Sequence, residues 1–487
     1  MLLGGLDIGT TGCKLTVYDD KGRWITNEYQ EYEIERNSGE HEIHADLIWD
    51  SVCRVIKETA RKAPELSAIG VTSFGETFVM MDENDKILGP SMLYTDPRGE
   101  EEIALLKNRL PEEQLINRSG TKPNHTYSIG KIMWVKEHQN QLYRHVKKIF
   151  LIADFIVYRL SGTAVIDYSL AARTAAFDIR RLCFSEEILS AAGIDGTLFS
   201  KPVPTGSLAG NMKRELCKEF GFINDVKIII GGHDQISAAV GAGAFSPGEA
   251  VDGTGTVECV TPVFDRVPAD LALYENHYSV VPFVIPGTYV CYAYSYTGGA
   301  AVKWYRDTFH KGVKYETLNQ ILPKEPTGIL VLPHFAGAAT PYMDSGSKAA
   351  LLGITLETKD GDIYKAIMEG VTYEMRLNIE MLSQAGIRLG RLKATGGGAK
   401  SEEWLQIKAD ILGIPITALD AMEAGACGSC MMAGVALGLY ADYYQAGKHF
   451  VRQKKTFFPD SSRQERYEVI YKRYQKLYQA VRPLMNE

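Results

Sequence analysis

The sequence has few cysteines, no long apolar run and no excess of basic charge. Its 487 residues include only 8 cysteines, too few for the disulfide framework of a secreted domain. No stretch reaches the ~18 uninterrupted apolar residues of a membrane helix, and the N-terminus lacks the basic and apolar regions of a signal peptide. Lys and Arg number 53 against 60 Asp and Glu, which argues against nucleic-acid binding. We therefore expect a soluble, cytoplasmic protein with neither nucleic acid nor a membrane as its partner.

Strand-like and helix-like patterns alternate along the chain. Residues 2–8 form an apolar strand pattern, a Gly/Thr turn follows, and residues 13–18 continue as a second strand. Residues 45–63 carry apolar side chains at helical spacing, and residues 68–72 have the pattern of a short buried strand. This alternation predicts an α/β fold.

The opening pattern returns near the middle of the chain. An apolar strand pattern over residues 226–230 leads into a glycine pair, and a second strand with a Gly/Thr turn begins at Gly248. No low-complexity segment or short-period repeat interrupts the chain. We therefore expect two halves of similar plan that meet near residue 246.

The first Gly/Thr turn, Asp7-x-Gly-Thr-Thr, has the composition of a phosphate-binding loop. Its glycines let the backbone approach a polyphosphate, and the hydroxyls of Thr10 and Thr11 can donate hydrogen bonds to it. Asp7, at a strand end, can hold a hydrated Mg²⁺, which prefers oxygen ligands, and Lys14 is close enough in sequence to reach the same phosphates. Taken alone, so short a motif favours an ordinary β-turn with a capping Asp.

A second turn, Asp252-Gly-Thr-Gly-Thr, favours phosphate binding over an ordinary β-turn. Two such turns at the starts of two α/β halves can face each other across a cleft and hold one nucleotide from both sides. The pair indicates an actin-like ATPase core. A third glycine-rich segment, residues 395–401, lies between a strand pattern and a helix pattern over residues 402–412. It fits a nucleotide-binding turn and a close-packed helix start equally well.

Asp234 is the strongest candidate for a catalytic residue. It follows the strand pattern of residues 226–230 in the segment Gly-Gly-His-Asp-Gln, where two glycines leave space above the strand end. Ligands of open α/β sheets bind at the carboxyl ends of strands, and a carboxylate there can accept a hydroxyl proton during phosphoryl transfer. A helix N-cap is the alternative role for a single Asp at this point.

Three weaker candidates complete the analysis of single residues and motifs. Glu76 and Asp96 follow strand-like segments of the first half and either bind sugar hydroxyls or only solvate a loop. Cys427 and Cys430 form a C-x-x-C motif in a segment rich in Ala, Gly and Met. Two buried thiols on a packed helix are favoured there, and a redox site is the minor alternative.

The motifs together resemble the FGGY family of carbohydrate kinases over essentially the whole chain. Residues 131–138 are similar to the first family signature, although Thr126 departs from its usual first residue. Residues 349–354, 362–363 and 366–369 resemble the second signature closely. Residues 154–162, 167–169 and 177–179 also look like family segments.

The resemblance implies an α/β fold of two actin-like, ribonuclease-H-like domains with a central cleft for ATP and a sugar. We expect an N-terminal domain over residues 1–245 and a C-terminal domain over residues 246–487. The implied reaction is the phosphorylation of a sugar, ketose, polyol or related acid by ATP with Mg²⁺. The implied partners are therefore the sugar and ATP, and the sequence leaves a homodimer open.

Individual site roles follow from the same resemblance. Asp234 matches the general base, and Asp7 the Mg²⁺ residue, through water. The residues that match the nucleotide site are Thr10, Thr11, Lys14, Gly253, Thr254, Gly299, Gly396, Gly397 and Ser401. Those that match acceptor-binding positions are Glu76, Asp96 and Gln235.

The sugar or polyol that accepts the phosphoryl group is harder to predict. The sequence matches neither of the two best-known substrate specificities of the family, D-xylulose and glycerol, at all of their typical residues. The segment around Glu76 lacks the Met-His pair typical of D-xylulose kinases, and Gly75 stands where glycerol kinases carry Arg. Two carboxylates suit the vicinal diols of a neutral acceptor and should disfavour an anionic one. We therefore expect a small ketose, pentulose-like, or a polyol rather than a sugar acid.

Two other functions compete with a kinase. A non-kinase actin-like ATPase, such as a heat-shock chaperone, also opens with Asp-x-Gly-Thr-Thr, but it needs a further peptide-binding domain. A catalytically silent sugar-binding or regulatory protein on the same fold would not need Asp234 and both phosphate turns, which are intact here. The kinase is therefore the favoured function.

Overall fold

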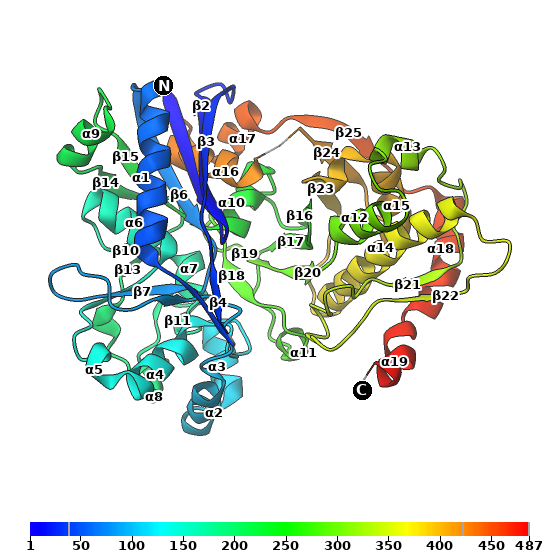
Figure 1. The fold of residues 1–487 in the computed structure, drawn as a ribbon, viewed down its shortest axis with the longest axis horizontal. Helices are drawn as coiled ribbons and strands as arrows, with labels where there is room; N and C mark the ends of the chain where they lie inside the picture. Colours follow the sequence, from blue (N-terminus) through cyan, green and yellow to red (C-terminus); the bar gives the residue numbers. More distant parts are fainter. Residues whose placement is uncertain (38, 421–422, 486–487) are drawn as a thin grey trace.

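A computed structural model describes residues 1–37, 39–420 and 423–485 of the chain. This part of the chain is built around two large β-sheets, one mainly from each half, with helices packed around them (Figure 1). The alternation of strands and helices confirms the predicted α/β fold. No helix in the described ranges is long and apolar enough to cross a membrane.

The first sheet has six strands in the order β14–β15–β6–β1–β2–β3. Its three central strands, β15, β6 and β1, run parallel, and the two strands at one end, β2 and β3, continue from β1 as antiparallel neighbours. Because parallel strands end at one edge, the chain segments that follow β1, β6 and β15 meet there. The strands are β1 (Leu2–Ile8), β2 (Gly12–Asp19), β3 (Trp24–Glu31), β6 (Leu66–Ser73), β14 (Leu208–Asn211) and β15 (Lys227–His233).

The second sheet repeats this plan. A hairpin of β16 and β17 is followed, far along the chain, by β23 and β24, which run parallel to β16. The two sheets therefore confirm the expected halves of similar plan. The strands are β16 (Glu249–Thr254), β17 (Glu258–Phe264), β18 (Val280–Pro282), β19 (Tyr289–Cys291), β20 (Ala293–Ser295), β23 (Arg391–Thr395), β24 (Ile416–Leu419) and β25 (Gln453–Phe457).

Small sheets of two or three short strands lie outside the two large sheets. They are β4 (Glu35–Asn37), β5 (Glu40–Ile43) and β8 (Ser91–Met92); β7 (Phe78–Met81) with β9 (Lys148–Leu151); β10 (Val165–Asp167) with β13 (Lys201–Val203); β11 (Phe177–Asp178) with β12 (Cys183–Phe184); and β21 (Leu330–Leu332) with β22 (Ala350–Leu352).

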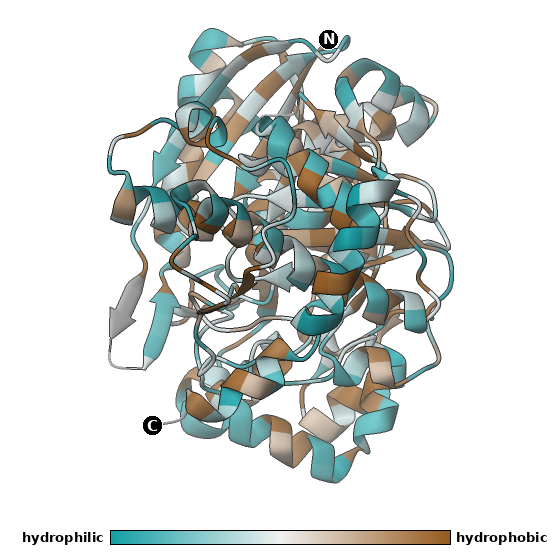
Figure 2. Ribbon diagram, turned by 90° about the vertical axis from the view of Figure 1, so that its right-hand side faces the viewer, coloured by the Kyte–Doolittle hydropathy of each residue, from teal (hydrophilic) through white to brown (hydrophobic). Residues whose placement is uncertain are grey.

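Helices connect the strands and cover the sheets. Figure 2 shows hydrophilic and hydrophobic residues side by side along the outer helices, as expected for helices with one face on a core. In the first half they are α1 (Ala45–Lys62), α2 (Glu100–Arg109), α3 (Glu112–Ser119), α4 (Ser128–His138), α5 (Asn140–Tyr143), α6 (Ile152–Ser161), α7 (Tyr168–Ala172), α8 (Glu186–Ala192), α9 (Arg214–Phe220) and α10 (Asp234–Gly241). In the second half they are α11 (Ala272–Glu275), α12 (Gly299–Phe309), α13 (Tyr315–Asn319), α14 (Asp360–Gln384), α15 (Glu402–Leu412), α16 (Ala424–Ala436), α17 (Tyr443–Phe450), α18 (Ser461–Tyr474) and α19 (Leu477–Val481).

One helix of the second half lies on the sheet of the first half. α16 packs against β1, β6 and α10, and Figure 1 shows it beside β2 and α10. Small residues allow this close approach: a Cβ on Gly5 would lie 2.0 Å from the carbonyl oxygen of Ala426, and one on Gly428 would lie 1.8 Å from that of Ser237. The start of α16 is thereby brought to the edge of the first sheet at which β1 and β15 end.

Candidate active site

Asp234 and Asp7 lie at the same edge of the first sheet. Asp234 follows β15 and is the first residue of α10, and Asp7 is the penultimate residue of β1. Burial, with the negative charge of Asp7 as the next cause, raises the pKa of Asp234 to about 7. A carboxylate with a pKa near neutrality is suited to take up a proton at physiological pH.

One carboxylate oxygen of Asp234 lacks a donor. Within the described residues, its buried Oδ1 has no hydrogen-bond partner. The nearest ring nitrogen, Nε2 of His233, lies 3.3 Å away, and Nδ1 of that ring lies 3.0 Å from the hydroxyl of Tyr292. Burial, together with the charge of Arg173, lowers the pKa of His233 well below its usual value, so the ring is neutral and does not offset the carboxylate.

The first Gly/Thr turn leaves its hydroxyls free. The backbone N–H of Gly9 donates to the carbonyl of Gly12 over 2.9 Å and closes the turn between β1 and β2. Thr11 is exposed and Thr10 is half-buried, and neither hydroxyl makes a hydrogen bond within the described chain. The turn can therefore offer both hydroxyls to an anion.

Lys14 is paired with a residue that the sequence analysis did not select. Its ammonium nitrogen lies 2.8 Å from Oε1 of Glu423, which directly precedes α16. Burial, with the charge of Glu423 as the next cause, raises the pKa of Asp7 to about 6, and Lys14 only partly opposes this. Negative charge therefore exceeds positive charge around Asp7.

This excess fits a hard divalent cation. Asp7 and Glu423 offer carboxylate oxygens, the ligand type that Mg²⁺ prefers. The described ranges hold no group of three or more metal-ligating side chains. Mg²⁺ would therefore keep several of its waters, as it usually does in nucleotide sites.

The second Gly/Thr turn connects β16 and β17 and orients its two threonines differently. Thr254 is only 1% exposed, and its hydroxyl donates to Asp252 and accepts from the ammonium of Lys408. Thr256 is exposed and lines the large cavity described next. The side chain predicted from sequence, Thr254, therefore points into the protein, so only its backbone is available to a ligand.

A large cavity lies between the second and third glycine-rich turns. It has a volume of about 670 Å³, within the range typical of small-molecule sites. Gly299, Gly397 and Ser401 line it together, although they are far apart in the sequence. Gly396 lies beside it and lines a neighbouring cavity on the other side of the third turn. Four aromatic residues, Trp304, Tyr315, Tyr364 and Trp404, form part of its wall.

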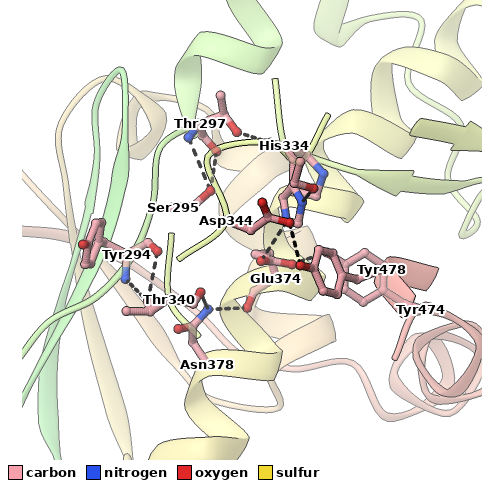
Figure 3. Close-up of polar contacts among 12 residues, drawn as sticks. Tyr294, Ser295, Thr297, His334, Thr340, Asp344, Glu374, Asn378, Tyr474 and Tyr478 are labelled. Atoms are coloured by element: carbon pink, nitrogen blue, oxygen red, sulfur yellow. Dashed lines mark hydrogen bonds and ion pairs between the residues drawn. The ribbon is translucent and has the colours of Figure 1, made fainter. Parts of the chain in front are cut away.

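Buried hydrogen bonds support the segment that leads into Gly299. The Thr297 hydroxyl donates to the carbonyl of Pro333, and the next residue, His334, lies 3.1 Å from Oε1 of Glu374 (Figure 3). Figure 3 also shows Tyr474, the last residue of α18, reaching Glu374. The nucleotide-side turn is thereby tied to α14 and α18.

Glu76 is paired with an arginine from a distant part of the chain. The guanidinium of Arg173 donates from Nε to Oε1 of Glu76 over 2.5 Å, and the tyrosine rings of Tyr127 and Tyr292 lie 5.0 and 5.6 Å from it. Glu76 is 4% exposed. The charge of the Glu76 carboxylate is therefore neutralised by Arg173. A sugar bound here would meet a hydrogen-bond donor, Arg173, beside a hydrogen-bond acceptor, Glu76.

Asp96 is also paired, and it is less accessible. It is fully buried, and its oxygens accept hydrogen bonds from Arg98 and from the backbone N–H of His41. The Arg98 side chain holds the pKa of Asp96 below its usual value against the opposing effect of burial. Both oxygens of Asp96 therefore already have donors, and its role as a sugar ligand stays a prediction.

A small cavity adjoins the Glu76–Arg173 pair. Its volume is about 50 Å³, and residues of both halves line it, including Lys122, Arg173, His277 and Met343. His277, Met343 and Glu76 are non-glycine residues with positive φ values of 64°, 47° and 63°. Strained backbone of this kind is concentrated at functional sites, which supports this cavity as part of the acceptor site.

Several neighbours of the candidate site gave no clear signal in the sequence. Arg173 directly follows α7, and Glu423 precedes an Ala/Gly-rich helix, but neither residue type is distinctive there. Thr256 is the second threonine of the Asp252-Gly-Thr-Gly-Thr turn, so the motif contained it, but no local pattern showed which of the two threonines faces the cavity. Gln235 follows Asp234 on α10, is half-buried, and its side chain makes no hydrogen bond within the described residues.

The C-x-x-C motif has the structural role that was favoured. Cys427 and Cys430 are buried on α16, and both are free thiols. Burial raises the pKa of Cys427 to about 12 and that of Cys430 well above its usual value. Thiols that do not ionise and do not reach solvent are unreactive, so the redox alternative is wrong.

Comparison with known proteins defines the class. Residues 2–241 match the N-terminal domain of the FGGY family of carbohydrate kinases, and residues 252–437 match its C-terminal domain. The chain belongs to this family, whose fold has two actin-like, ribonuclease-H-like domains. The predicted family and enzyme class, a carbohydrate kinase, are confirmed.

The relatives are named for different substrates. The chain is 27% identical to a xylulose kinase of Lactococcus lactis, over 97% of this chain and 96% of the relative. It is 28% identical to a gluconokinase of Bacillus licheniformis, over 90% and 87%. The crystal structure of a ligand-bound xylulose kinase from Lactobacillus acidophilus superposes with a TM-score of 0.91 at 23% identity, over 99% and 98% of the two chains, and shows the shared fold.

Proposed function

We propose that this kinase transfers the γ-phosphoryl group of ATP to a hydroxyl of a small sugar or polyol, with Asp234 as the general base. The observation that carries the proposal is the unpartnered Oδ1 of Asp234. It lies on a carboxylate with a pKa of about 7, at the sheet edge that also carries the first phosphate turn.

The nucleotide is proposed to occupy the 670 Å³ cavity, with its adenosine against the third turn and the aromatic wall. Its phosphates then extend toward the first and second turns. Thr10, Thr11 and Lys14 would bind them from the first half, and the backbone at Gly253 and Thr254 from the second. Gly299 and Gly397 leave room for the backbone to approach, and Ser401 caps α15 beside the cavity.

The chemical step needs one proton acceptor. As the acceptor hydroxyl oxygen bonds to the γ-phosphorus, the bond from phosphorus to the β,γ-bridging oxygen breaks and ADP leaves. Asp234 takes the hydroxyl proton on its free oxygen. Proton transfer of this kind contributes about 10²–10⁴-fold to rate. Mg²⁺, held near Asp7 through water with Glu423 alongside, would supply positive charge that offsets the phosphates.

The acceptor is proposed to contact Glu76, Arg173 and Gln235. A neutral acceptor, either a small pentulose-like ketose or a polyol, was expected from sequence, and the xylulose kinase relatives support the ketose. The electrostatic reason for excluding sugar acids is weakened, because Glu76 is neutralised by Arg173 and Asp96 by Arg98. The carboxylates therefore do not decide between neutral and acidic acceptors, and both belong in the substrate panel.

The domain boundary between residues 245 and 246 is likewise proposed. The two family matches end and begin at residues 241 and 252, on either side of it. α16 is the exception to a simple division, because it packs on the first sheet.

A substrate panel tests the proposed function. ADP release from ATP and Mg²⁺ is measured with D-xylulose, D-ribulose, glycerol, D-gluconate and no acceptor. A kinase gives acceptor-dependent turnover that Asp234→Asn lowers by about 10²–10⁴-fold. Turnover that no acceptor stimulates would favour a non-kinase actin-like ATPase. Sugar binding by calorimetry without turnover would favour a silent regulator.

A further inference from the structure

Lys408 is a buried lysine beneath the second phosphate turn. It lies on α15 and is 1% exposed. Its ammonium donates to Oδ2 of Asp252 over 2.6 Å, to the Thr254 hydroxyl over 2.6 Å and to Oε1 of Glu258 over 2.8 Å. All three donor positions of the ammonium are thus occupied by residues that enter or leave the turn.

Such a cluster is costly in a protein core. Burial by itself would lower the pKa of Lys408, but the charges of Asp252 and Glu258 outweigh it and keep the ammonium protonated. The carboxylate of Glu258 is buried as well, and its second oxygen has no hydrogen-bond partner in the described part of the protein. Buried ion pairs are often no more stabilising than apolar residues of similar volume, so a specific geometric role is a better explanation than stability.

The cluster fixes the geometry of the turn. Thr254 and Glu258 face each other across the β16–β17 hairpin, and Lys408 binds both. The third turn packs on the same point, since a Cβ on Gly396 would lie 2.5 Å from the carbonyl oxygen of Thr254. One helical turn before Lys408, Trp404 lines the large cavity, and its ring lies 5.2 Å from the ammonium.

We propose that Lys408 is a positioning residue for ATP: through Thr254, Asp252 and Glu258 it holds the second phosphate turn in the conformation that receives the phosphates. The inference rests on the proposed function, because it takes ATP as the ligand of this turn. It also gives the inward-facing Thr254 hydroxyl a role. The bound hydroxyl anchors the turn, while the backbone and Thr256 face the nucleotide.

Lys408→Met tests this, with Lys393→Met as the matched control. Lys393 is another buried lysine of the second half, with a carboxylate partner, Glu249, at 3.1 Å, and it does not line the large cavity. Calorimetry measures ATP affinity, steady-state kinetics measure both KM values and kcat, and thermal unfolding measures stability. We expect Lys408→Met to weaken ATP binding roughly ten- to hundredfold while the acceptor KM changes little. Lys393→Met should lower the Tm but change ATP affinity less than about twofold.

Conservative changes at Thr254 keep the test decisive if Lys408→Met does not fold. Thr254→Val removes the hydroxyl and keeps the shape, so it should weaken ATP binding selectively. Thr254→Ser keeps the hydroxyl and should restore near wild-type affinity. Equal loss of ATP and acceptor affinity, or Thr254→Val behaving like wild type, would overturn the positioning role while the kinase proposal stands. A wild-type chain that binds no ATP would overturn both.

Discussion

Lys14 and Glu423 are 409 residues apart in the chain and form an ion pair of 2.8 Å at the candidate active site. Lys14 lies on β2, in the first half, and Glu423 precedes α16, in the second. The pair forms because α16 crosses back onto the first sheet, and it connects the two halves beside the first phosphate turn.

Loss of the Lys14 charge should weaken nucleotide binding. In Lys14→Gln, the negative charges of Glu423 and Asp7 lose their opposing cation, and the phosphates lose a donor. We expect the KM for ATP to rise roughly tenfold or more, measured at saturating acceptor. Lys21→Gln, an exposed lysine in the turn after β2, is the control and should leave this KM unchanged. An unaltered KM in Lys14→Gln would contradict a phosphate contact.

Asp234→Asn should separate chemistry from binding. The amide keeps the shape of the side chain but cannot take the hydroxyl proton, so kcat should fall by about 10²–10⁴-fold. ATP affinity, measured by calorimetry, should stay within a few-fold of wild type, since the turns are intact. Near-normal turnover in this variant would remove Asp234 from the role of general base.

The pH dependence of kcat/KM should report the ionisation of Asp234. Its pKa is raised from 3.8 to about 7, and only the ionised form can accept a proton. kcat/KM should therefore rise with pH below about 7, by up to tenfold per unit, and level off above it. Initial rates between pH 5.5 and 8.5 test this. A flat profile over that range would mean that the base has an ordinary carboxylate pKa.

Glu76 and Asp96 should differ in their effect on the acceptor. Glu76→Gln removes a charge next to the small cavity and should raise the acceptor KM about tenfold, with little change for ATP. Asp96→Asn disrupts a buried pair with Arg98 that lies behind the wall, so it should lower the Tm and change the acceptor KM much less. Equal increases in acceptor KM for both variants would instead make Asp96 a direct ligand.

Two neighbouring glycines should respond differently to a side chain. A Cβ on Gly397 meets no atom within 4 Å, so Gly397→Val should fold normally but fill space in the nucleotide cavity. Gly396 has a φ of 82°, and a Cβ there would lie 2.5 Å from the Thr254 carbonyl, so Gly396→Val should lower the Tm. Thermal unfolding and ATP calorimetry compare the two variants. Unchanged ATP affinity in Gly397→Val would exclude the third turn from the nucleotide site.

Local patterns predicted the elements well, because neighbouring residues carry the information for them. The strand over residues 2–8 and the helix over residues 402–412 appear with those bounds, as β1 and α15. The helix expected over residues 45–63 is α1, Ala45–Lys62. Glycine-rich turns are equally local, since a turn depends on the backbone freedom of a few adjacent residues.

The candidate site was predicted less completely, because side-chain partners come from distant segments. Glu76 was expected to offer a free carboxylate, but Arg173, 97 residues away, binds it. Thr254 was expected to face the nucleotide, but Lys408, 154 residues away, holds its hydroxyl inside. Ion pairing of this kind depends on which helices pack together, and no local pattern contains that information.

The sequence alone thus determined the α/β class, the repeated plan of the two halves and the three glycine-rich turns, since each depends on periodicity or on a few adjacent residues. The tertiary structure decided the charges and directions within the site. Packing of α16 on the first sheet brought Glu423 to Lys14, and packing of α15 against β24 and β25 of the second sheet brought Lys408 to Thr254. Burial at the sheet edge then raised the pKa of Asp234 toward neutrality, because a carboxylate loses its hydration only when the whole chain folds around it.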